Sequence, residues 1–330
     1  MNGVELARRF YEQEVRPLLA GSEHAAALLG NGSEVLGYDD EVSTDHDFGP
    51  RVQVLLPPEA TTSHHLPEGT ELTTVDSFFR RRLGFDPADG VDLRDWLCTP
   101  TQTLATLTAG AVFHDPDGML ARRRAALAWY PDDVWRYVLA AGWLRIGQEE
   151  AFVGRTGGTG DDLGSRVVAA RLVRDLMRLA FLIERRWAPY SKWLGRAFAG
   201  LPLAVTVGPP LAAAVAAPGW REREAALCEA GSILGAATDA LGLAEHVDPT
   251  PRQFYTRDIR VVGADRFAVA LTEAVRDPEV SALIDRLGRR HDDAVGTLPG
   301  GIDQAVDSVD VLCHPDRCRA AARVLGLPAS

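Results

Sequence analysis

The stretch Gly32-Ser33-Glu34-Val35-Leu36-Gly37-Tyr38-Asp39-Asp40-Glu41-Val42-Ser43-Thr44-Asp45-His46-Asp47 is the most informative part of the 330-residue chain. Asp45 and Asp47 are separated by one residue, so in an extended chain their carboxylates point to the same face. Paired carboxylates suit hard divalent cations, which take oxygen ligands and bridge phosphates. Gly32 and Ser33 supply backbone N–H groups and a hydroxyl that suit phosphate oxygens. The stretch predicts a metal-assisted phosphate site, with an acidic surface loop as the alternative.

Strands and helices alternate on both sides of this motif as far as residue 129. An apolar stripe at helical spacing predicts a helix over residues 4–19. Apolar runs framed by turn residues predict short strands at Glu34–Tyr38, Arg51–Leu56, Glu71–Val75 and Ala109–His114. A further helix is expected near Asp76–Leu83.

The pattern becomes helical from residue 130 onward. Helices are expected at residues 132–153, 162–187, 220–242, 264–275 and 278–290, with a glycine-rich turn at 154–160 and a short strand at 260–262. The sequence therefore predicts an α+β fold: an N-terminal α/β domain with a small mixed sheet over residues 1–129, and a C-terminal helical domain over residues 130–330.

The composition limits the class of partner. Hydrophobic residues make up 46% and charged residues 25% of the chain, as in ordinary soluble globular proteins. The net charge of −11 disfavours a nucleic-acid partner, because proteins that grip many phosphates are usually basic. An acidic cleft instead suits a cationic small molecule. Four cysteines form no disulfide scaffold, and no segment reads as a membrane span or signal peptide, so a cytoplasmic protein is expected.

The motif carries a resemblance to a known superfamily. Gly32-Ser33 followed by Asp45-His46-Asp47 resembles the signature of the DNA polymerase β-like nucleotidyltransferases. The order of an α/β domain and a helical domain also resembles the aminoglycoside adenylyltransferases. Resemblance to the DUF4037 branch covers nearly the whole chain, through the run from Gly32 to Arg51 and the later segments Gly154-Arg155, Asp162-Leu163-Gly164, Pro189-Tyr190-Ser191-Lys192-Trp193, Ile302-Asp303-Gln304 and Asp307-Ser308.

The resemblance implies a nucleotidyltransferase catalytic domain over residues 1–129 and a helical substrate- and nucleotide-binding domain over residues 130–330. It implies transfer of a nucleoside monophosphate, AMP from ATP, to a hydroxyl of a small molecule, with two Mg²⁺ ions at Asp45 and Asp47. The sequence departs from the superfamily pattern at Phe48-Gly49-Pro50, where Gly and Pro interrupt the strand that should begin at the aspartates.

The resemblance also implies a third acid on a neighbouring strand. Glu71 in Thr70-Glu71-Leu72-Thr73-Thr74-Val75 matches the position of a glutamate that deprotonates the acceptor. Negative charge nearby would raise its pKa towards a useful value. Asp76 is the alternative, and it would otherwise cap the helix that follows.

Nucleotide phosphates have several candidate partners. Gly32 and Ser33 would hold the β- and γ-phosphates. Lys192 is the only lysine in the chain, so it marks a position where a compact ammonium is needed beside the expected cleft between the domains. Arg155 and Arg166 flank the start of a helix and are further phosphate candidates.

Candidates for the acceptor site are polar or aromatic. Asp161 and Asp162 would orient an amine or cap the following helix. Tyr190 and Trp193 would stack on a ring or belong to the core. A cluster after Gly300-Gly301 would bind substrate or tie the C-terminus to the core; its members are Asp303, Gln304 and Asp307.

Two other functions remain open on the sequence. The fold would also serve a nucleotide-binding or toxin–antitoxin-type module that binds or modifies a protein, although three mutually repelling carboxylates favour catalysis. Terminal addition to RNA is disfavoured by the acidic charge. Cys313-His314 with Cys318 lacks a fourth zinc ligand, and Gly157-Gly158-Thr159-Gly160 lacks the Lys-Ser/Thr of a phosphate-binding P-loop.

Overall fold

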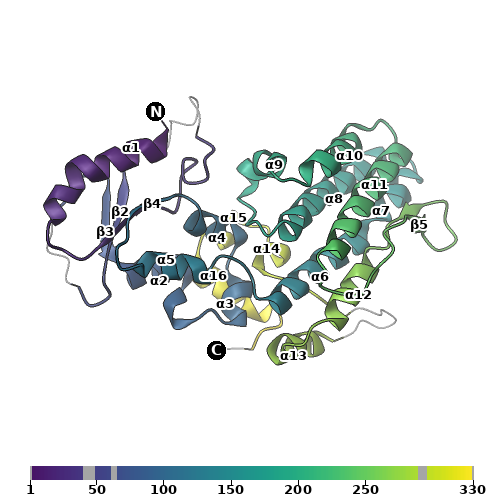
Figure 1. The fold of residues 1–330 in the computed structure, drawn as a ribbon. Coiled ribbons are helices and arrows are strands. Elements are labelled where there is room, and N and C mark those ends of the chain that lie inside the picture. The colour runs from purple at the N-terminus through teal and green to yellow at the C-terminus, as the bar shows by residue number, and fades with distance from the viewer. Residues whose placement is uncertain (1, 40–48, 61–64, 289–295, 329–330) are drawn as a thin grey trace. The chain divides into compact units, whose positions relative to one another are not determined.

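A computed structural model describes residues 2–39, 49–60, 65–288 and 296–328. The chain divides into two compact units, and each is drawn from two segments (Figure 1). Unit 1 comprises Met1–Trp129 and Val306–Ala321, and unit 2 comprises Tyr130–Ala305 and Ala322–Ser330. Unit 1 is a mixed α/β unit and unit 2 is mainly helical, which confirms the predicted α+β class.

A four-stranded sheet organises unit 1. Its strands are β1 (Ala25–Leu28), β2 (Val52–Leu56), β3 (Thr70–Thr74) and β4 (Ala111–His114), in the order β3-β2-β1-β4. β1 is antiparallel to both β2 and β4, whereas β2 and β3 are parallel. The end of β1 therefore lies at the same edge of the sheet as the starts of β2 and β3.

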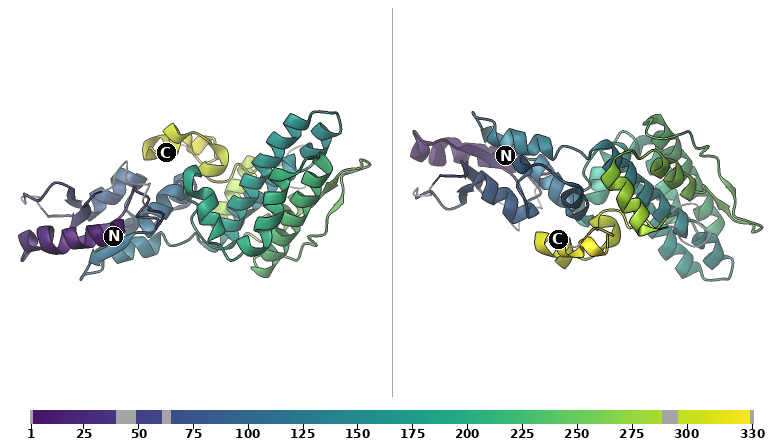
Figure 2. Two further views of the ribbon diagram at one scale, coloured as in Figure 1. Left: turned by 90° about the horizontal axis from the view of Figure 1, so that it is seen from above. Right: turned by 90° about the horizontal axis from the view of Figure 1, so that it is seen from below.

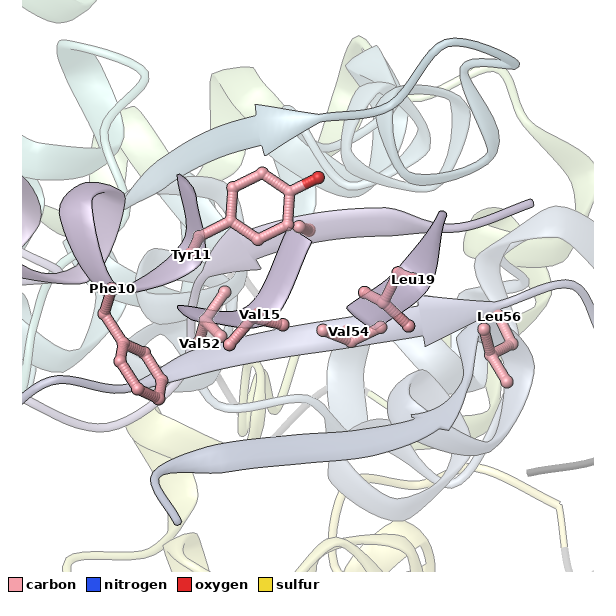
Figure 3. Packing of buried hydrophobic residues seen from close by; sticks show 8 residues of the cluster. Phe10, Tyr11, Val15, Leu19, Val52, Val54 and Leu56 are labelled. Atoms are coloured by element: carbon pink, nitrogen blue, oxygen red, sulfur yellow. The ribbon is translucent and has the colours of Figure 1, made fainter. Parts of the chain in front are cut away.

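One face of the sheet is covered by the N-terminal helical segment. Helix α1 (Gly3–Phe10) continues as a π turn at Tyr11–Val15 and a 3-10 turn at Arg16–Leu19, so the segment is helical throughout, as predicted. Figure 3 shows the apolar side chains of this segment packed on those of β2. The cluster is formed by Phe10, Tyr11, Val15, Leu19, Ala26, Val52, Val54 and Leu56.

Helices complete unit 1. They are α2 (Val75–Leu83), α3 (Leu93–Cys98), α4 (Thr101–Thr108), α5 (Met119–Ala126), α15 (Val309–Leu312) and α16 (Pro315–Ala320). The late helix α16 packs against α2 and α3. Arg319 on α16 forms an ion pair with Asp95, whose side chain is buried. Residues 306–321 are thus a structural part of unit 1.

Unit 2 is a packed set of helices with one short hairpin. Its helices are α6 (Asp132–Glu149), α7 (Phe152–Gly157), α8 (Asp162–Ile183), α9 (Ser191–Ala199), α10 (Ala204–Ala216), α11 (Trp220–Ala240), α12 (Asp265–Glu273), α13 (Pro278–Leu287) and α14 (Ile302–Ala305). Figure 2 shows the long helices α8, α10 and α11 side by side, and these helices contact one another. The hairpin pairs β5 (Arg252–Gln253) with β6 (Arg260–Val261).

The predicted strand at Glu34–Tyr38 is wrong, because these residues form turns. Glu34 turns back to an ion pair with Arg51, and Gly37 has a φ of +72°, which an extended strand does not allow. The strand that precedes the glycine turn is β1, Ala25–Leu28, a run of buried small apolar residues. The other three predicted strands of this unit are confirmed.

The predicted glycine-rich turn at 154–160 begins inside a helix. Gly154 and Gly157 lie in helix α7. Helix α11 packs so closely on both that a side chain at either position would clash with it. A Cβ on Gly154 would lie 2.7 Å from the Glu224 carboxylate, and one on Gly157 would lie 2.3 Å from the Trp220 ring. These glycines serve close packing of α7 on α11, not a loop.

Candidate active site

The glycine-rich turn after β1 lies beside the start of β2. Arg51, directly before β2, donates a hydrogen bond from its guanidinium to the carbonyl oxygen of Asn31 in the turn. On the other side, the N–H of Gly30 donates to the carbonyl oxygen of Thr106 on α4 at 3.0 Å. Arg51 follows Asp47 by four residues in the chain. Described residues on both sides of the sequence motif therefore meet at one edge of the sheet.

A buried ion pair fixes the shape of this turn. The Glu34 carboxylate, which is 6% exposed, accepts hydrogen bonds from Nε and Nη2 of Arg51 at 2.9 and 2.5 Å. Gly32 has a φ of +124°, and a Cβ there would lie 2.2 Å from Arg51 Nη2 and 2.5 Å from the Glu34 carboxylate. A side chain at position 32 would therefore strain the backbone and would have to displace the ends of the Arg51 and Glu34 side chains.

The backbone N–H groups of the turn have no acceptor in the part of the chain that the structure describes. Among the residues that the structure describes, none accepts a hydrogen bond from the N–H groups of Asn31, Gly32 or Ser33. The carbonyl oxygen of Ser33 instead accepts from the N–H groups of Leu36 and Tyr38, which closes the chain after the turn. Successive backbone N–H groups in a turn form a concave site for phosphate oxygens.

Glu71 lies at the same edge of the sheet as the turn. It pairs with Gln53 across β3 and β2, and the Gln53 side chain accepts from the N–H of Leu29 at 2.8 Å. Its carboxylate accepts from Arg81 at 3.0 Å and from Arg82 at 2.9 and 3.1 Å. Among the described residues, the expected neighbouring negative charge is therefore replaced by two guanidinium groups. The predicted negative neighbours, Asp45 and Asp47, lie outside the described residues, so the predicted effect of their charge on Glu71 stays a prediction.

Arg82 joins Glu71 to the turn. Its guanidinium lies 3.8 Å above the ring of Phe78, which fixes the side chain on the α2 surface. A Cβ on Gly30 would lie 3.6 Å from Arg82 Nε. Two positive side chains therefore lie beside the turn. Arg51, directly before β2, contacts Asn31, and Arg82, which pairs with Glu71 of β3, lies beside Gly30.

Asp76, the alternative acid, lies beyond the other end of β3. The N-cap of α2 is Thr74, so Asp76 stands in the first turn and does not cap the helix as expected. Its Oδ1 is buried and has no hydrogen-bond partner among the described residues. Because β1 and β3 run in opposite directions, Asp76 is at the edge of the sheet away from the glycine turn. The topology favours Glu71 over Asp76 as a neighbour of the turn.

Asp45 and Asp47 lie outside the described residues. Their fit to magnesium rests on their chemistry, since carboxylate oxygens are the ligands that hard divalent cations take. Within residues 2–39, 49–60, 65–288 and 296–328, no group of three or more His, Cys, Asp or Glu side chains forms a metal site. The described part of the chain therefore offers no alternative metal centre.

In unit 2, the predicted phosphate and stacking residues of the 189–193 segment lie at the start of α9. Lys192 is exposed, and its Nζ lies 4.9 Å from the centre of the Trp193 ring. Trp193 is buried and donates from its indole nitrogen to the Tyr190 hydroxyl at 2.7 Å. Trp193 therefore belongs to the core of unit 2, whereas Lys192 and the partly exposed Tyr190 face solvent.

The two arginines expected to bind phosphate are placed differently from that prediction. Arg155 lies in the last turn of α7, where the helix dipole disfavours an anion. Arg166 donates to Asp162 at 2.7 Å and to the carbonyl oxygens of Ala217 and Pro218 at 3.3 and 2.9 Å. Arg166, one turn after the start of α8, thus links α8 to the end of α10. Phosphate binding by either residue stays a prediction.

The acidic pair before α8 has structural roles. Asp161 is the N-cap of α8 and accepts from the N–H of Gly164 at 2.8 Å. Asp162 forms ion pairs with Arg166 and Arg223, and these guanidinium groups hold the pKa of Asp162 below its usual value. The capping alternative accounts for Asp161, and the exposed Asp162 carboxylate pairs with the buried guanidinium of Arg223.

The predicted C-terminal cluster does not belong to one unit. Gln304 donates to the carbonyl oxygen of Val138 on α6 at 2.9 Å, and its own amide oxygen accepts from the N–H of Gly301. The carbonyl oxygen of Asp303 accepts from Arg178 at 2.9 Å. Asp307 falls in unit 1. Asp303 and Gln304 therefore tie this segment to the helices of unit 2.

Sequence reasoning missed three residues that shape the turn: Glu34, Arg51 and Arg82. The available signal was the charge of Arg51 at the start of a strand that follows paired aspartates. Nothing in the sequence sets Arg82 apart, because it belongs to a run of three arginines, residues 80–82, near the end of α2. Only the tertiary fold distinguishes Arg82 from its neighbours.

A family model and a solved structure are similar to parts of the chain. Residues 96–194 match the family described as "Domain of unknown function (DUF4037)", which confirms that resemblance over this segment. Among solved structures, a nucleotidyltransferase-like protein from Exiguobacterium sibiricum 255-15 is similar at 13% identity, over 72% of this chain and 77% of that chain, with a TM-score of 0.32. No curated protein matches the chain.

A helix that spans a membrane needs about 20 consecutive, mainly apolar residues. Among the described residues, no helix is both long and apolar enough to span a membrane.

Proposed function

We propose that this protein is a magnesium-dependent nucleotidyltransferase that moves AMP from ATP onto a hydroxyl of a small molecule. The observation that carries the proposal is the turn at Asn31, Gly32 and Ser33, whose N–H groups have no acceptor among the described residues. Arg51 binds this turn directly to the strand that follows Asp45-His46-Asp47 in the chain. A phosphate cradle and paired aspartates in this order support nucleotidyl transfer.

The residues of the turn have the role of binding phosphate. The N–H groups of Gly32 and Ser33 hold the β- and γ-phosphate oxygens, while the nearby guanidinium of Arg82 offsets their charge. Asp45 and Asp47 would hold Mg²⁺, which, when bound, neutralises phosphate charge. Lys192 remains our proposed cation for the leaving pyrophosphate, because it is the only lysine and its ammonium is exposed.

Glu71 is proposed to take the proton of the acceptor. In the described structure its carboxylate is engaged by Arg81 and Arg82. A triphosphate bound at the turn would compete for Arg82 and so release a Glu71 oxygen. The acceptor oxygen then forms a bond to the α-phosphorus, its proton goes to Glu71, and the bond to the β-phosphate oxygen breaks to release pyrophosphate. Arg82 thereby couples nucleotide binding to the availability of the base.

The acceptor is proposed to be a small, cationic molecule. The net charge of −11 supports this choice, because an acidic surface raises the local concentration of a cation. The same charge argues against a nucleic acid as acceptor.

Pyrophosphate release tests the proposal. Each NTP is incubated with Mg²⁺ and a panel of amines, sugars, aminoglycosides and other small metabolites. Asp45→Asn or Asp47→Asn should lower turnover by at least ~100-fold, the scale of losing a main electrostatic contributor. Asp117→Asn changes an exposed acid of unit 1 and is the matched control. Near-normal turnover in both motif variants would remove the metal assignment, and ATP binding without turnover on any acceptor would favour a binding module.

A further inference from the structure

A concave site lies wholly within unit 2, and none of its lining residues belongs to the proposed catalytic site. Its volume is about 400 Å³, within the range of ~300–1,000 Å³ typical of small-molecule sites. It lies where the β5–β6 hairpin approaches the end of α6 and the start of α12 (Figure 1). The lining includes Gln148, Arg252, Phe254, Tyr255, Asp265 and Arg266.

Glu150 anchors the frame of this cavity. Its carboxylate accepts from the N–H groups of Val262, Gly263 and Ala264 at 2.8, 3.2 and 3.0 Å. At Gly147 the start of α12 comes so close that a Cβ would lie 2.9 Å from the N of Asp265. Helix α6, the hairpin and α12 are therefore held rigidly around the space, as a preorganised ligand site requires.

Two guanidinium groups stand together at the wall of the cavity. Both approach Gly263, where a Cβ would lie 3.0 Å from Arg266 Nε and 3.2 Å from Arg252 Cδ. Arg252 Nε is buried and has no hydrogen-bond partner among the described residues, and the ion pair of this side chain with Asp248 is long at 3.6 Å. Burial and the neighbouring Arg252 charge lower the pKa of Arg266. Adjacent cations with an unused buried donor are stabilised by an oxyanion.

An exposed aromatic pair forms another part of the lining. Phe254 packs on the apolar cluster of the hairpin, and the Tyr255 ring meets it edge to face at 4.8 Å. Tyr255 is 84% exposed and has a φ of +50°, which is uncommon for a bulky residue. The exposed Tyr255 ring is therefore available to a ligand at the mouth of the cavity.

The carboxylates of the lining define what else the ligand must carry. The Glu150 oxygens are taken by backbone N–H groups, whereas Asp265 and the Gln148 amide also line the cavity. A ligand that is only an anion would be repelled by the negative charge of Asp265. A ligand with hydroxyl or amine donors on its ring would satisfy Asp265 while its oxyanion meets the two arginines.

We infer that this cavity binds a small ligand in which an oxyanion, phosphate or carboxylate, is joined to a planar ring that bears hydrogen-bond donors. A nucleoside monophosphate has this chemistry. The oxyanion lies against Arg252 and Arg266, the ring against Tyr255, and a ring donor against Asp265. The site is independent of the proposed transfer reaction.

Binding is tested by calorimetry on the full chain with four probes: AMP, 4-aminobenzoate, adenosine and inorganic phosphate. The experiments use the Asp45→Asn variant in EDTA, so that metal-dependent binding at the motif does not contribute. Binding of AMP at least ten times tighter than adenosine and phosphate is expected. Comparison of AMP with 4-aminobenzoate then distinguishes a phosphate from a carboxylate ligand.

The matched variants are Arg252→Met and Arg257→Met. Both remove one positive charge from the hairpin, but only Arg252 lines the cavity. Arg252→Met should weaken binding of the better probe at least tenfold, and Arg257→Met should leave it unchanged. Tyr255→Ala, at an exposed position, should also weaken it and covers the case in which Arg252→Met fails to fold. Equal affinity in all variants, or no binding of either AMP or 4-aminobenzoate up to about 1 mM, would overturn the inference.

Discussion

Ionisation of Glu150 should make the stability of unit 2 depend on pH. Burial raises the pKa of this carboxyl to about 7 from a usual value of 4.5, in spite of three backbone N–H donors that lower it. Below pH ~4.5 the group is protonated in both the folded and the unfolded chain. Between pH 4.5 and 7 the unfolded chain loses this proton while the folded chain keeps it, so rising pH favours unfolding. Above pH 7 the contribution stays constant.

The size of the effect follows from the shift. Each unit of pKa difference corresponds to about 1.4 kcal/mol, so a shift from 4.5 to about 7 lowers the free energy of unfolding by about 3 kcal/mol across this range. Glu150→Gln should remove most of that decrease, because the amide cannot ionise. We expect the difference between wild-type protein and this variant to appear in urea unfolding followed by circular dichroism at pH 4.5, 5.5, 6.5 and 7.5.

The control for that experiment is Glu149→Gln, the neighbouring glutamate, which forms an ion pair with Arg171 at the surface of the helices. The free energy of unfolding of this variant should change with pH in the same way as that of the wild-type protein. If the free energy of unfolding of Glu150→Gln also follows the wild-type pH dependence, burial does not hold a proton on Glu150, and the reasoning fails.

Four further changes have defined outcomes. Gly32→Ala should lower kcat/KM at least ~10-fold, because its Cβ would collide with Arg51. The control Gly37→Ala is also at positive φ but has nothing within 4 Å, so it should cost only backbone strain. Equal rates in the two variants would contradict the role of the Gly32–Arg51 contact. Glu71→Gln should reduce turnover but keep ATP affinity within a few-fold, and a loss of ATP binding by calorimetry would assign it a structural role. Lys192→Arg should weaken use of ATP in initial-rate assays, and full activity would show that an ammonium is not required. Arg223→Met should lower the free energy of unfolding in urea by about 1–3 kcal/mol, because this fully buried guanidinium donates hydrogen bonds to Ser165 and to the carbonyl oxygen of Ala217; an unchanged free energy would be inconsistent with that role.

The sequence was a good guide to the class of fold and to most elements. Strong periodicity identified the long helices, and alternation identified β2, β3 and β4. It failed at β1, because Ala25–Leu28 has weak strand propensity and becomes a strand only through pairing on both sides. Helix α10 likewise continues through Pro209 and Pro210, a pattern that local propensity disfavours.

The candidate site was predictable only in part. The glycine turn was visible in the sequence because Gly and Ser stand at characteristic spacing from paired aspartates. The ion pairs around it were not, since Glu34–Arg51 and Glu71–Arg82 form only once the strands have paired. Arg166 and Asp162 show the converse case: charged residues near a helix start that looked functional are anchors between helices.

The return of residues 306–321 to unit 1 has a consequence for synthesis on the ribosome. Helix α16 supplies Arg319 to the buried Asp95 and covers parts of α2 and α3, yet all of residues 130–305 emerge before it. At about 5–20 residues per second, this delay lasts roughly 10–35 s. During that time unit 1 lacks α15 and α16, and the surfaces that they cover stay exposed. The nascent chain should therefore be a target for chaperones, although all four strands of its sheet have emerged. Cleavage after Trp129 would make the same incomplete state permanent.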